Sequence, residues 1–315
     1  MIQAPIKVFL TGAAGQIGHD LAALLRARFD LIAPARGALD LADPRRVRAA
    51  VRAARPALIV NAAAYTRVDD AEREPEAAHA LNAGAPLALA EAARECGAGL
   101  IHYSTDYVFD GARDRPYRED DEPRPLGVYG ASKLAGERAV LDALEPALVL
   151  RTSWVYGARR VNFMLKMLEL FRTREEVRVV DDQTGTPNWC RSLAEATVHI
   201  LDRALRHPGG PSDFLTAQRG LYHLSLAGST SWFGFARAIH ELAPPELAAA
   251  FKQQGSNLIP ARRADFPAPA ARPAHSVLDS GKMRNTFGLD LPPWELELGK
   301  CLRAMAAVAD GPRLG

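Results

Sequence analysis

Residues 6–18 read IKVFLTGAAGQIG, and this stretch decides the fold that we expect for the chain. Residues 6–10 have the apolar character of a short buried strand, and a helix with an apolar face follows the glycines. In such a unit Gly12 permits a tight turn, Gly15 lets the backbone approach a pyrophosphate, and Gly18 allows close packing of helix on strand. The N–H groups at the helix start then face the anion. The pattern predicts a dinucleotide site, and a tight turn without a ligand is the alternative.

Strand-like and helix-like segments alternate outward from this stretch. Further strands are expected at residues 31–34, 57–60, 100–103 and 147–150, with helices such as 75–95 and 129–144 between them. This alternation predicts an α/β fold with a doubly wound, Rossmann-like parallel sheet. After Arg151 the alternation loosens, and a smaller C-terminal substrate-binding lobe is expected.

The end of the second expected strand indicates which dinucleotide is bound. An acidic residue there would bind the adenosine 2′-hydroxyl of NAD, whereas arginine suits the 2′-phosphate of NADP. The strand is followed by Arg36 and by no carboxylate at its tip. NADPH is therefore the expected cofactor, with NADH possible; a solvated loop charge is the alternative for Arg36. Residues 61–66 (NAAAYT) end the third expected strand, where small residues admit a nucleotide or allow tight helix packing.

A hydroxyl and a Tyr–Lys pair form the candidate catalytic group. Thr105 ends an expected strand within STDYVF (residues 104–109), and Tyr129 and Lys133 lie four apart on an expected helix, hence on one face. A protonated lysine beside a phenol lowers the phenol's pKa, so the tyrosine can exchange a proton with a carbonyl oxygen. The pair predicts ketone/alcohol redox chemistry, although a chance pair on a surface helix is the alternative.

Composition sets the remaining bounds. With 315 residues, 48% hydrophobic content and a net charge of +2, we expect one large or two coupled domains, and neither nucleic acid nor membrane binding. The three cysteines are widely spaced and the chain start has no long apolar stretch, which favours the cytoplasm. The eight histidines show no ligand spacing, so no metal is assigned. The oligomeric state, monomer or homodimer, stays open.

Seven phrases in a fixed order identify a family. They are VNAAAYTRVD (60–69), STDYVFDG (104–111), YGASKLAGE (129–137), RTSWVY (151–156), DQTGTP (182–187), GLYHL (220–224) and RPAHS (272–276). With the Gly-x-x-Gly-x-x-Gly turn, they resemble the dTDP-4-dehydrorhamnose reductase family, within the extended short-chain dehydrogenases/reductases. The resemblance runs from about residue 6 to residue 302.

The resemblance implies NADPH-dependent reduction of the C4 ketone of dTDP-4-dehydro-6-deoxy-L-mannose to dTDP-L-rhamnose, in polysaccharide biosynthesis. Hydride would reach C4 from the nicotinamide while Tyr129 gives a proton to the oxygen. Lys133 would hold the nicotinamide ribose and keep the pKa of Tyr129 low, and Thr105 would bind the same oxygen. It also implies an NADP-binding domain of residues 1–155 and 192–224, with residues 156–191 and 225–315 forming the lobe.

The family pattern also assigns the binding residues. Trp154 would lie against the deoxysugar, with core packing as its alternative, and Arg262 or Arg263 compete with Arg272 for the diphosphate. The expected cofactor-binding residues are Gly12, Gly15, Gln16, Ile17, Gly18, Arg36, Asp40, Leu41, Ala63, Ala64, Tyr65, Thr66, Tyr129 and Lys133. The expected substrate-binding residues are Thr105, Asp106, Tyr107, Trp154, Asn162, Gln183 and Arg272.

Departures from the family leave alternatives open. Some relatives carry carboxylates associated with Mg²⁺ at a subunit contact, and here Asp20 fits one position while Arg191 and Ala304 replace the others. No metal is therefore expected to be required, and Mg²⁺ is doubtful. The rival functions are an NAD-retaining sugar-nucleotide epimerase or dehydratase, and a non-catalytic regulatory subunit of the same fold.

Overall fold

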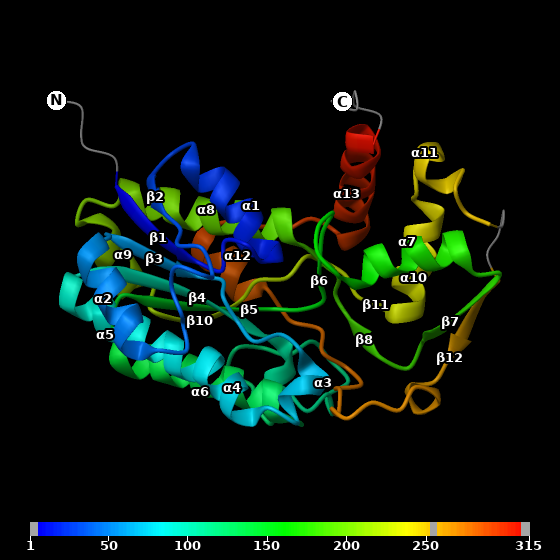
Figure 1. Cartoon of the computed structure of the whole chain (residues 1–315), viewed down its shortest axis with the longest axis horizontal. Coiled ribbons are helices and arrows are strands. Elements are labelled where there is room, and N and C mark those ends of the chain that lie inside the picture. The colour runs from blue at the N-terminus through cyan, green and yellow to red at the C-terminus, as the bar shows by residue number, and fades with distance from the viewer. Residues whose placement is uncertain (1–5, 253–256, 310–315) are drawn as a thin grey trace.

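The computed structural model describes residues 6–252 and 257–309, and it confirms the predicted α/β fold with a parallel sheet (Figure 1). The sheet has six parallel strands in the order β10-β5-β4-β3-β1-β2. The strands are β1 (Lys7–Thr11), β2 (Asp30–Ile32), β3 (Leu58–Asn61), β4 (Gly99–Thr105), β5 (Ala147–Thr152) and β10 (Gly220–His223). The strand order reverses between β1 and β3, and ligands of such sheets bind at this switch point, beyond the carboxyl ends of the strands.

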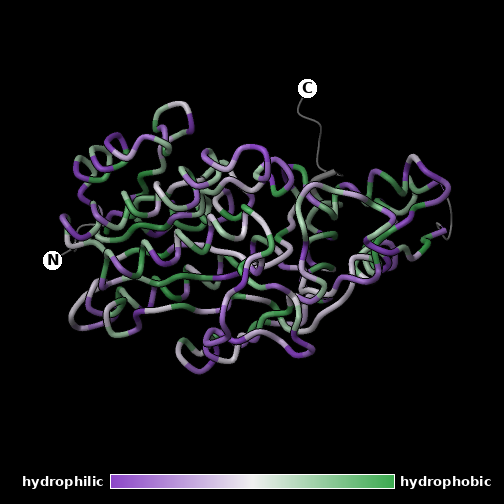
Figure 2. Tube along the Cα trace, turned by 90° about the horizontal axis from the view of Figure 1, so that it is seen from below, coloured by the Kyte–Doolittle hydropathy of each residue, from purple (hydrophilic) through white to green (hydrophobic). Residues whose placement is uncertain are grey.

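Helices cover both faces of the sheet (Figure 1). One face packs against α1 (Gln16–Arg26), α8 (Cys190–Arg206), α9 (Gly210–Ala217) and α12 (Gly281–Phe287). The other face packs against α2 (Pro44–Ala54), α5 (Ala85–Cys96) and α6 (Val128–Ala143). In Figure 2 the hydrophobic stretches of the trace run through the strands, while the outer loops are largely hydrophilic. The strands are thus buried on both sides, as expected for a parallel sheet.

The helix predicted for residues 75–95 has a wide turn in its middle. It consists of α4 (Pro75–His79), the π-helical turn η1 (Ala80–Gly84) and α5. The turn brings the buried Asn82 side chain to the loop after β3, where it binds both backbone groups of Tyr65. Single π turns inside helices are frequent at functional sites. The short helix α3 (Val68–Ala71) follows the same loop.

The smaller part of the molecule lies beside the sheet and has its own apolar core around Phe171, Phe235 and Trp294 (Figure 1). Its helices are α7 (Phe163–Thr173), α10 (Trp232–Glu241), α11 (Pro245–Ala248) and α13 (Trp294–Ala309). Its strands pair in twos, β7 (Glu176–Val180) with β12 (Asn257–Ala261), β8 (Thr184–Gly185) with β11 (Thr230–Ser231), and β6 (Val155–Tyr156) with β9 (Asn188–Trp189).

One segment of the predicted lobe lies elsewhere. The range 225–315 includes α12, yet Met283 and Phe287 of this helix are buried in the core of the sheet, where Phe287 packs against Tyr222 and Phe214. The assignment of α12 to the lobe is thus wrong, because its two apolar residues are buried against the sheet. The exact domain boundaries stay a prediction. Residues 1–5, 253–256 and 310–315 of the predicted ranges lie outside the described residues.

The polar loop of residues 110–125 is packed rather than free. Tyr117 stacks on Phe109 with ring centroids 4.1 Å apart and donates a hydrogen bond to Asp110. Asp121 is buried and pairs with Arg113 and Arg115, and these arginines lower the pKa of its carboxyl to about 2. The loop is therefore tied to the edge of the sheet, as a surface excursion rather than an open lid.

No helix of the described residues combines the length and the apolar character needed to cross a membrane.

The close contact of α6 with the backbone of the π turn gives a test of this packing. A Cβ added to Gly136 of α6 would collide with the backbone oxygen of Asn82. We expect Gly136→Ala to lower the free energy of unfolding by about 2 kcal/mol or more, because helix and backbone must separate. Urea titration followed by circular dichroism measures the change. Gly84→Ala is the control, since its Cβ would have its nearest contact at 3.9 Å and alanine suits a helix; an equal loss in both variants would contradict the packing argument.

Candidate active site

The glycine-rich turn fits an anionic cofactor. Gly12 has φ +76°, and a Cβ there would lie 2.5 Å from the backbone nitrogen of Ala63, so the turn and the loop after β3 are in direct contact. Helix α1 starts at Gln16 with no side-chain cap at Gly15 and no acidic residue in its first turn. Its first N–H groups therefore lack a side-chain partner, and together with the positive end of the helix dipole they suit a diphosphate.

The residues expected around the adenosine lie at the carboxyl ends of β2 and β3. Arg36 is exposed in the turn after β2, where the exposed Asp40 accepts a hydrogen bond from the backbone N–H of Ala42. Leu41 packs on the apolar core below. After β3, Ala63 and Ala64 are partly exposed and Thr66 is exposed.

Tyr65 contributes its backbone rather than its ring. The side chain is 5% exposed, and its hydroxyl donates to Glu74 and accepts from Arg67. The backbone N–H and C=O are both held by the amide of Asn82, at 2.8 and 3.1 Å. The same amide donates to the hydroxyl of Ser132 on α6 at 3.0 Å. Asn82 thus fixes the loop after β3 against the helix that carries Tyr129.

The structure brings Thr105, Tyr129 and Lys133 together. Thr105 ends β4, Tyr129 is the second residue of α6, and Lys133 lies one turn further on. The Thr105 hydroxyl lies beside the phenol of Tyr129 and acts to lower its pKa, and the Tyr129 and Tyr107 rings meet edge to face, with centroids 5.6 Å apart. The N-terminus of α6 is held in place by Glu72, whose carboxylate accepts from the N–H of Val128 at 2.8 Å.

Lys133 is buried at 2% exposure, and its ammonium donates to the backbone oxygen of Tyr103 at 2.6 Å. Burial lowers its pKa to about 8, and the carboxylate of Glu137 opposes this shift. The ammonium is therefore charged at neutral pH and loses its charge above pH 8. Glu137 is itself in a buried ion pair with Arg151 at 2.6 Å, which ties α6 to β5.

The expectation that Lys133 lowers the pKa of Tyr129 is wrong for this structure. Removal from water raises the pKa of Tyr129 to about 12, and the neighbouring Thr105 hydroxyl offsets this only in part. The nearby Asp106 carboxylate raises it further. Lys133 points to the carbonyl of Tyr103, so desolvation outweighs its charge. Tyr129 is consequently a neutral phenol, the form that can donate a proton.

Asp106 is a buried carboxyl group with no cation beside it in a salt bridge among the residues that the structure describes. It is 2% exposed, one oxygen accepts from the Thr105 hydroxyl at 3.1 Å, and the other is buried and has no partner among the described residues. Burial raises its pKa to about 7, and the neighbouring hydroxyls of Ser276 and Thr105 counteract this only in part. The carboxyl group lies beside Tyr129 and Tyr107, since its charge raises the pKa of both phenols.

Trp154 is packed against neighbouring residues. Its indole stacks on Trp232 with centroids 3.5 Å apart and planes within 4°. A Cβ built on Gly185 would lie 2.5–2.7 Å from three indole atoms, so this glycine also packs closely on the ring. One face of the indole is thus covered by Trp232, and the residue is still partly exposed. Its contact with the deoxysugar stays a prediction.

The other predicted substrate residues differ in their burial and in their hydrogen-bond partners. Arg272 is partly buried and pairs with Asp69 at 2.7 Å, and its charge acts on the neighbouring phenol of Tyr107, which places it at the site. Gln183 is buried in the loop before β8. Asn162 is engaged locally, because it caps α7 and donates to the backbone oxygens of residues 157, 159 and 160. Its amide holds that loop rather than pointing to a ligand.

Sequence analysis missed three groups that hold the site in place. Asn82 and Glu72 act on α6 from the other side of the loop after β3, and Ser276 lies beside Asp106 and acts to lower its pKa. A polar residue among the alanines of residues 77–93 was the only sequence signal for Asn82. Ser276 is part of the phrase RPAHS, where it was given no role.

Among the residues that the structure describes, no group of three or more His, Cys, Asp or Glu side chains is placed to hold a metal ion. Asp20 accepts a hydrogen bond from the thiol of Cys190 at 2.9 Å, and Arg191 pairs with Glu195.

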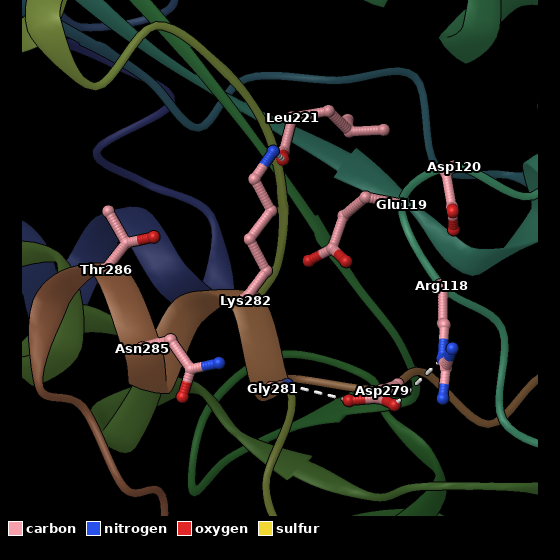
Figure 3. A pocket seen from close by; sticks show the side chains of 9 residues that line it. All are labelled: Arg118, Glu119, Asp120, Leu221, Asp279, Gly281, Lys282, Asn285 and Thr286. Atoms are coloured by element: carbon pink, nitrogen blue, oxygen red, sulfur yellow. Dashed lines mark hydrogen bonds and ion pairs between the residues drawn. The ribbon is translucent and has the colours of Figure 1, made fainter.

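A separate pocket of about 620 Å³ lies at the β10 edge of the sheet (Figure 3). Its lining residues are Arg118, Glu119, Asp120, Leu221, Asp279, Gly281, Lys282, Asn285 and Thr286. Lys282 spans it to the backbone oxygen of Leu221, Arg118 pairs with Asp279, and Glu119 accepts from the backbone N–H of His223. The pocket contains none of the predicted site residues.

Comparisons with known proteins were made on sequence and on structure. The sequence profile of the family described as RmlD substrate binding domain matches residues 6–307. The chain is 42% identical over 305 residues to the dTDP-4-dehydrorhamnose reductase of Burkholderia thailandensis, over 95% of this chain and 98% of that protein. It is 40% identical over 304 residues to that of Salmonella typhimurium, with 95% and 98% coverage. Among solved structures, dTDP-4-dehydrorhamnose reductase from Bacillus anthracis in complex with NADP matches with a TM-score of 0.84 and 35% identity, over 95% of this chain and 99% of that one.

The burial of Asp106 predicts a pH-dependent stability. Because its pKa is about 7 when folded and 3.8 otherwise, the folded state holds the proton more tightly, and stability is lost as the pH rises from about 4 to 7. We expect Asp106→Asn to gain stability over the wild type across this range, by up to roughly 4 kcal/mol above pH 7. Urea unfolding at pH 5 and pH 8 measures it. Asp114→Asn, at an exposed position, serves as control; a gain that is the same at both pH values would refute the argument.

Proposed function

The chain belongs to the RmlD substrate binding domain family, and from this premise we propose that it reduces the C4 ketone of dTDP-4-dehydro-6-deoxy-L-mannose to dTDP-L-rhamnose with NADPH. It is an NAD(P)H-dependent oxidoreductase of dTDP-rhamnose synthesis. The observation that carries the proposal is the joint position of Thr105, Tyr129 and Lys133 at the carboxyl end of β4, with the glycine-rich turn at the end of β1 in the same sheet.

The nicotinamide ring, when bound, supplies the hydride that adds to C4. Tyr129 donates its phenolic proton to the C4 oxygen, so the ketone becomes an alcohol and the tyrosine a phenolate that solvent reprotonates. A neutral phenol is the form that this direction requires, which agrees with its raised pKa. Thr105, whose hydroxyl lies beside the phenol, turns its proton from Asp106 to the same oxygen and aligns it.

Lys133 acts through its charge and its hydrogen bonds. The ammonium is fixed on the carbonyl of Tyr103, which leaves two N–H groups for the ribose hydroxyls of the nicotinamide half. Its positive charge also favours the phenolate that forms during the reaction. The backbone of Ala63 and Ala64 and the free N–H groups of α1 hold the remainder of the dinucleotide, with Arg36 on the 2′-phosphate.

The sugar nucleotide binds on the side of the smaller part. Asp106 accepts hydrogen bonds from the sugar hydroxyls through its unpartnered oxygen, and Tyr107 and Trp154 bound the ring. Arg272 holds the diphosphate, because its fork of N–H groups matches phosphate oxygens and it is placed beside Tyr107. Gln183 lines the same side. A cytoplasmic location and a monomeric or homodimeric state remain predictions from the sequence.

Removal of the phenolic hydroxyl tests the chemistry. We expect Tyr129→Phe to lower kcat by about a hundredfold or more, with NADPH affinity retained, because only the proton donor is lost. NADPH oxidation at 340 nm with the 4-keto sugar nucleotide measures it, and Tyr222→Phe is the control because that hydroxyl binds Gln218 on another helix. Unchanged turnover in Tyr129→Phe would contradict the mechanism.

The rival functions predict other results for the wild type. A wild type that purifies with bound NAD and oxidises no added NADPH would favour an epimerase. A wild type that shows no turnover at all would favour a regulatory subunit.

The cofactor preference is tested separately. We expect Arg36→Ala to lower the ratio of kcat/KM for NADPH over NADH by about tenfold or more, since one charge-assisted hydrogen bond to the 2′-phosphate is lost. Steady-state kinetics with both cofactors measure the ratio. Arg206→Ala, an exposed arginine at the end of α8, is the matched control. A ratio that does not move in Arg36→Ala would place the 2′-phosphate elsewhere.

A further inference from the structure

The loop between β6 and α7 reaches across to the glycine-rich turn. Its Arg160 donates a hydrogen bond from Nη1 to the backbone oxygen of Ala14 at 2.6 Å, although the two residues are 146 positions apart. Strand β6 also contacts α1. An arginine of the smaller part is therefore located at the N-terminal end of α1, the position at which the cofactor's diphosphate is expected.

The loop is held in one shape at a cost in backbone strain. Arg160 has φ +60°, a left-handed conformation that a residue with a side chain seldom adopts. The amide of Asn162 fixes it by donating to the backbone oxygens of Gly157, Arg159 and Arg160 at 2.8, 3.3 and 3.0 Å. Strain of this kind is found mainly where a function needs the side chain in a defined place. Here the side chain so placed is the guanidinium on the turn.

The local charge is suited to an anion. Arg159 and Arg160 are both exposed, and the hydrogen bond of Arg160 goes to a carbonyl, which does not neutralise its charge. Just after Ala14, which binds the guanidinium, α1 begins with N–H groups that no side chain caps, and it has no acidic residue in its first turn. The guanidinium and the helix start are thus both positive, which suits the two negative charges of a dinucleotide's diphosphate.

We propose that Arg160 binds the diphosphate of NADPH and that residues 157–162 form the outer wall of the cofactor site. Ala14 engages one nitrogen of the guanidinium, which leaves further N–H groups for phosphate oxygens, and the planar fork matches such oxygens in pairs. Asn162 is then a positioning residue for Arg160 rather than a ligand of the sugar nucleotide. The inference rests on the proposed function, since it presupposes that the chain binds NADPH.

Binding assays on the intact chain test the inference. Arg160→Gly is the variant of choice, because glycine adopts φ +60° without strain and the loop can keep its shape. We expect the Kd of NADPH, measured by its fluorescence, to rise about tenfold. The Kd of adenosine 2′-monophosphate, which lacks the diphosphate, should change by less than about twofold when measured by competition. Arg159→Ala removes the same charge from the same loop and should leave both constants within about twofold.

Three results would overturn the inference. They are an unchanged Kd of NADPH in Arg160→Gly, an equal weakening in Arg159→Ala, and an equal weakening of NADPH and adenosine 2′-monophosphate, which would make the loop a structural support only. A wild type that binds neither NADPH nor NADH would instead refute the proposed function, so the two failures are distinguishable.

Discussion

The structure depends on how closely the backbone of α6 approaches its neighbours. Two glycines make that approach possible, because a Cβ on Gly130 would collide with the backbone oxygen of Tyr107 and one on Gly136 with that of Asn82. The buried ion pair of Glu137 with Arg151 ties the same helix to β5. Helix α6 therefore has one position relative to β4 and the π turn. That position brings the Tyr129 phenol to Thr105 and the Lys133 ammonium to the end of the strand.

Burial, more than charge pairing, sets the protonation states at the site. The pKa of Tyr129 rises to about 12, that of Lys133 falls to about 8, and that of Asp106 rises to about 7, each chiefly through loss of water. At neutral pH the first is a neutral proton donor and the second a cation. A spacing argument treats Tyr129 and Lys133 as an isolated pair on a helix. It cannot include the protein that surrounds them, and so it gave the wrong sign for the phenol.

The substrate side shows the same limit. Trp154 was predicted to lie against the deoxysugar, and its stacking on Trp232 joins positions 78 residues apart and covers one face of its ring. The amide of Asn162 hydrogen-bonds the loop between β6 and α7, and this loop brings Arg160 to the glycine-rich turn. Residues of the smaller part thus reach the site through the way in which this part packs on the sheet. Local sequence patterns do not encode that packing.

From the sequence alone followed the alternation of strands and helices, the parallel sheet, the glycine-rich turn, the Tyr129–Lys133 pair and the family. These are determined by local periodicity, by glycine spacing and by short phrases that need no knowledge of distant contacts. The tertiary structure decided the protonation of Tyr129, the stacking of Trp154 on Trp232, the place of α12 on the sheet and the contact of Arg160 with Ala14. Each of these depends on desolvation or contact between residues far apart in the chain, and only the folded molecule brings them together.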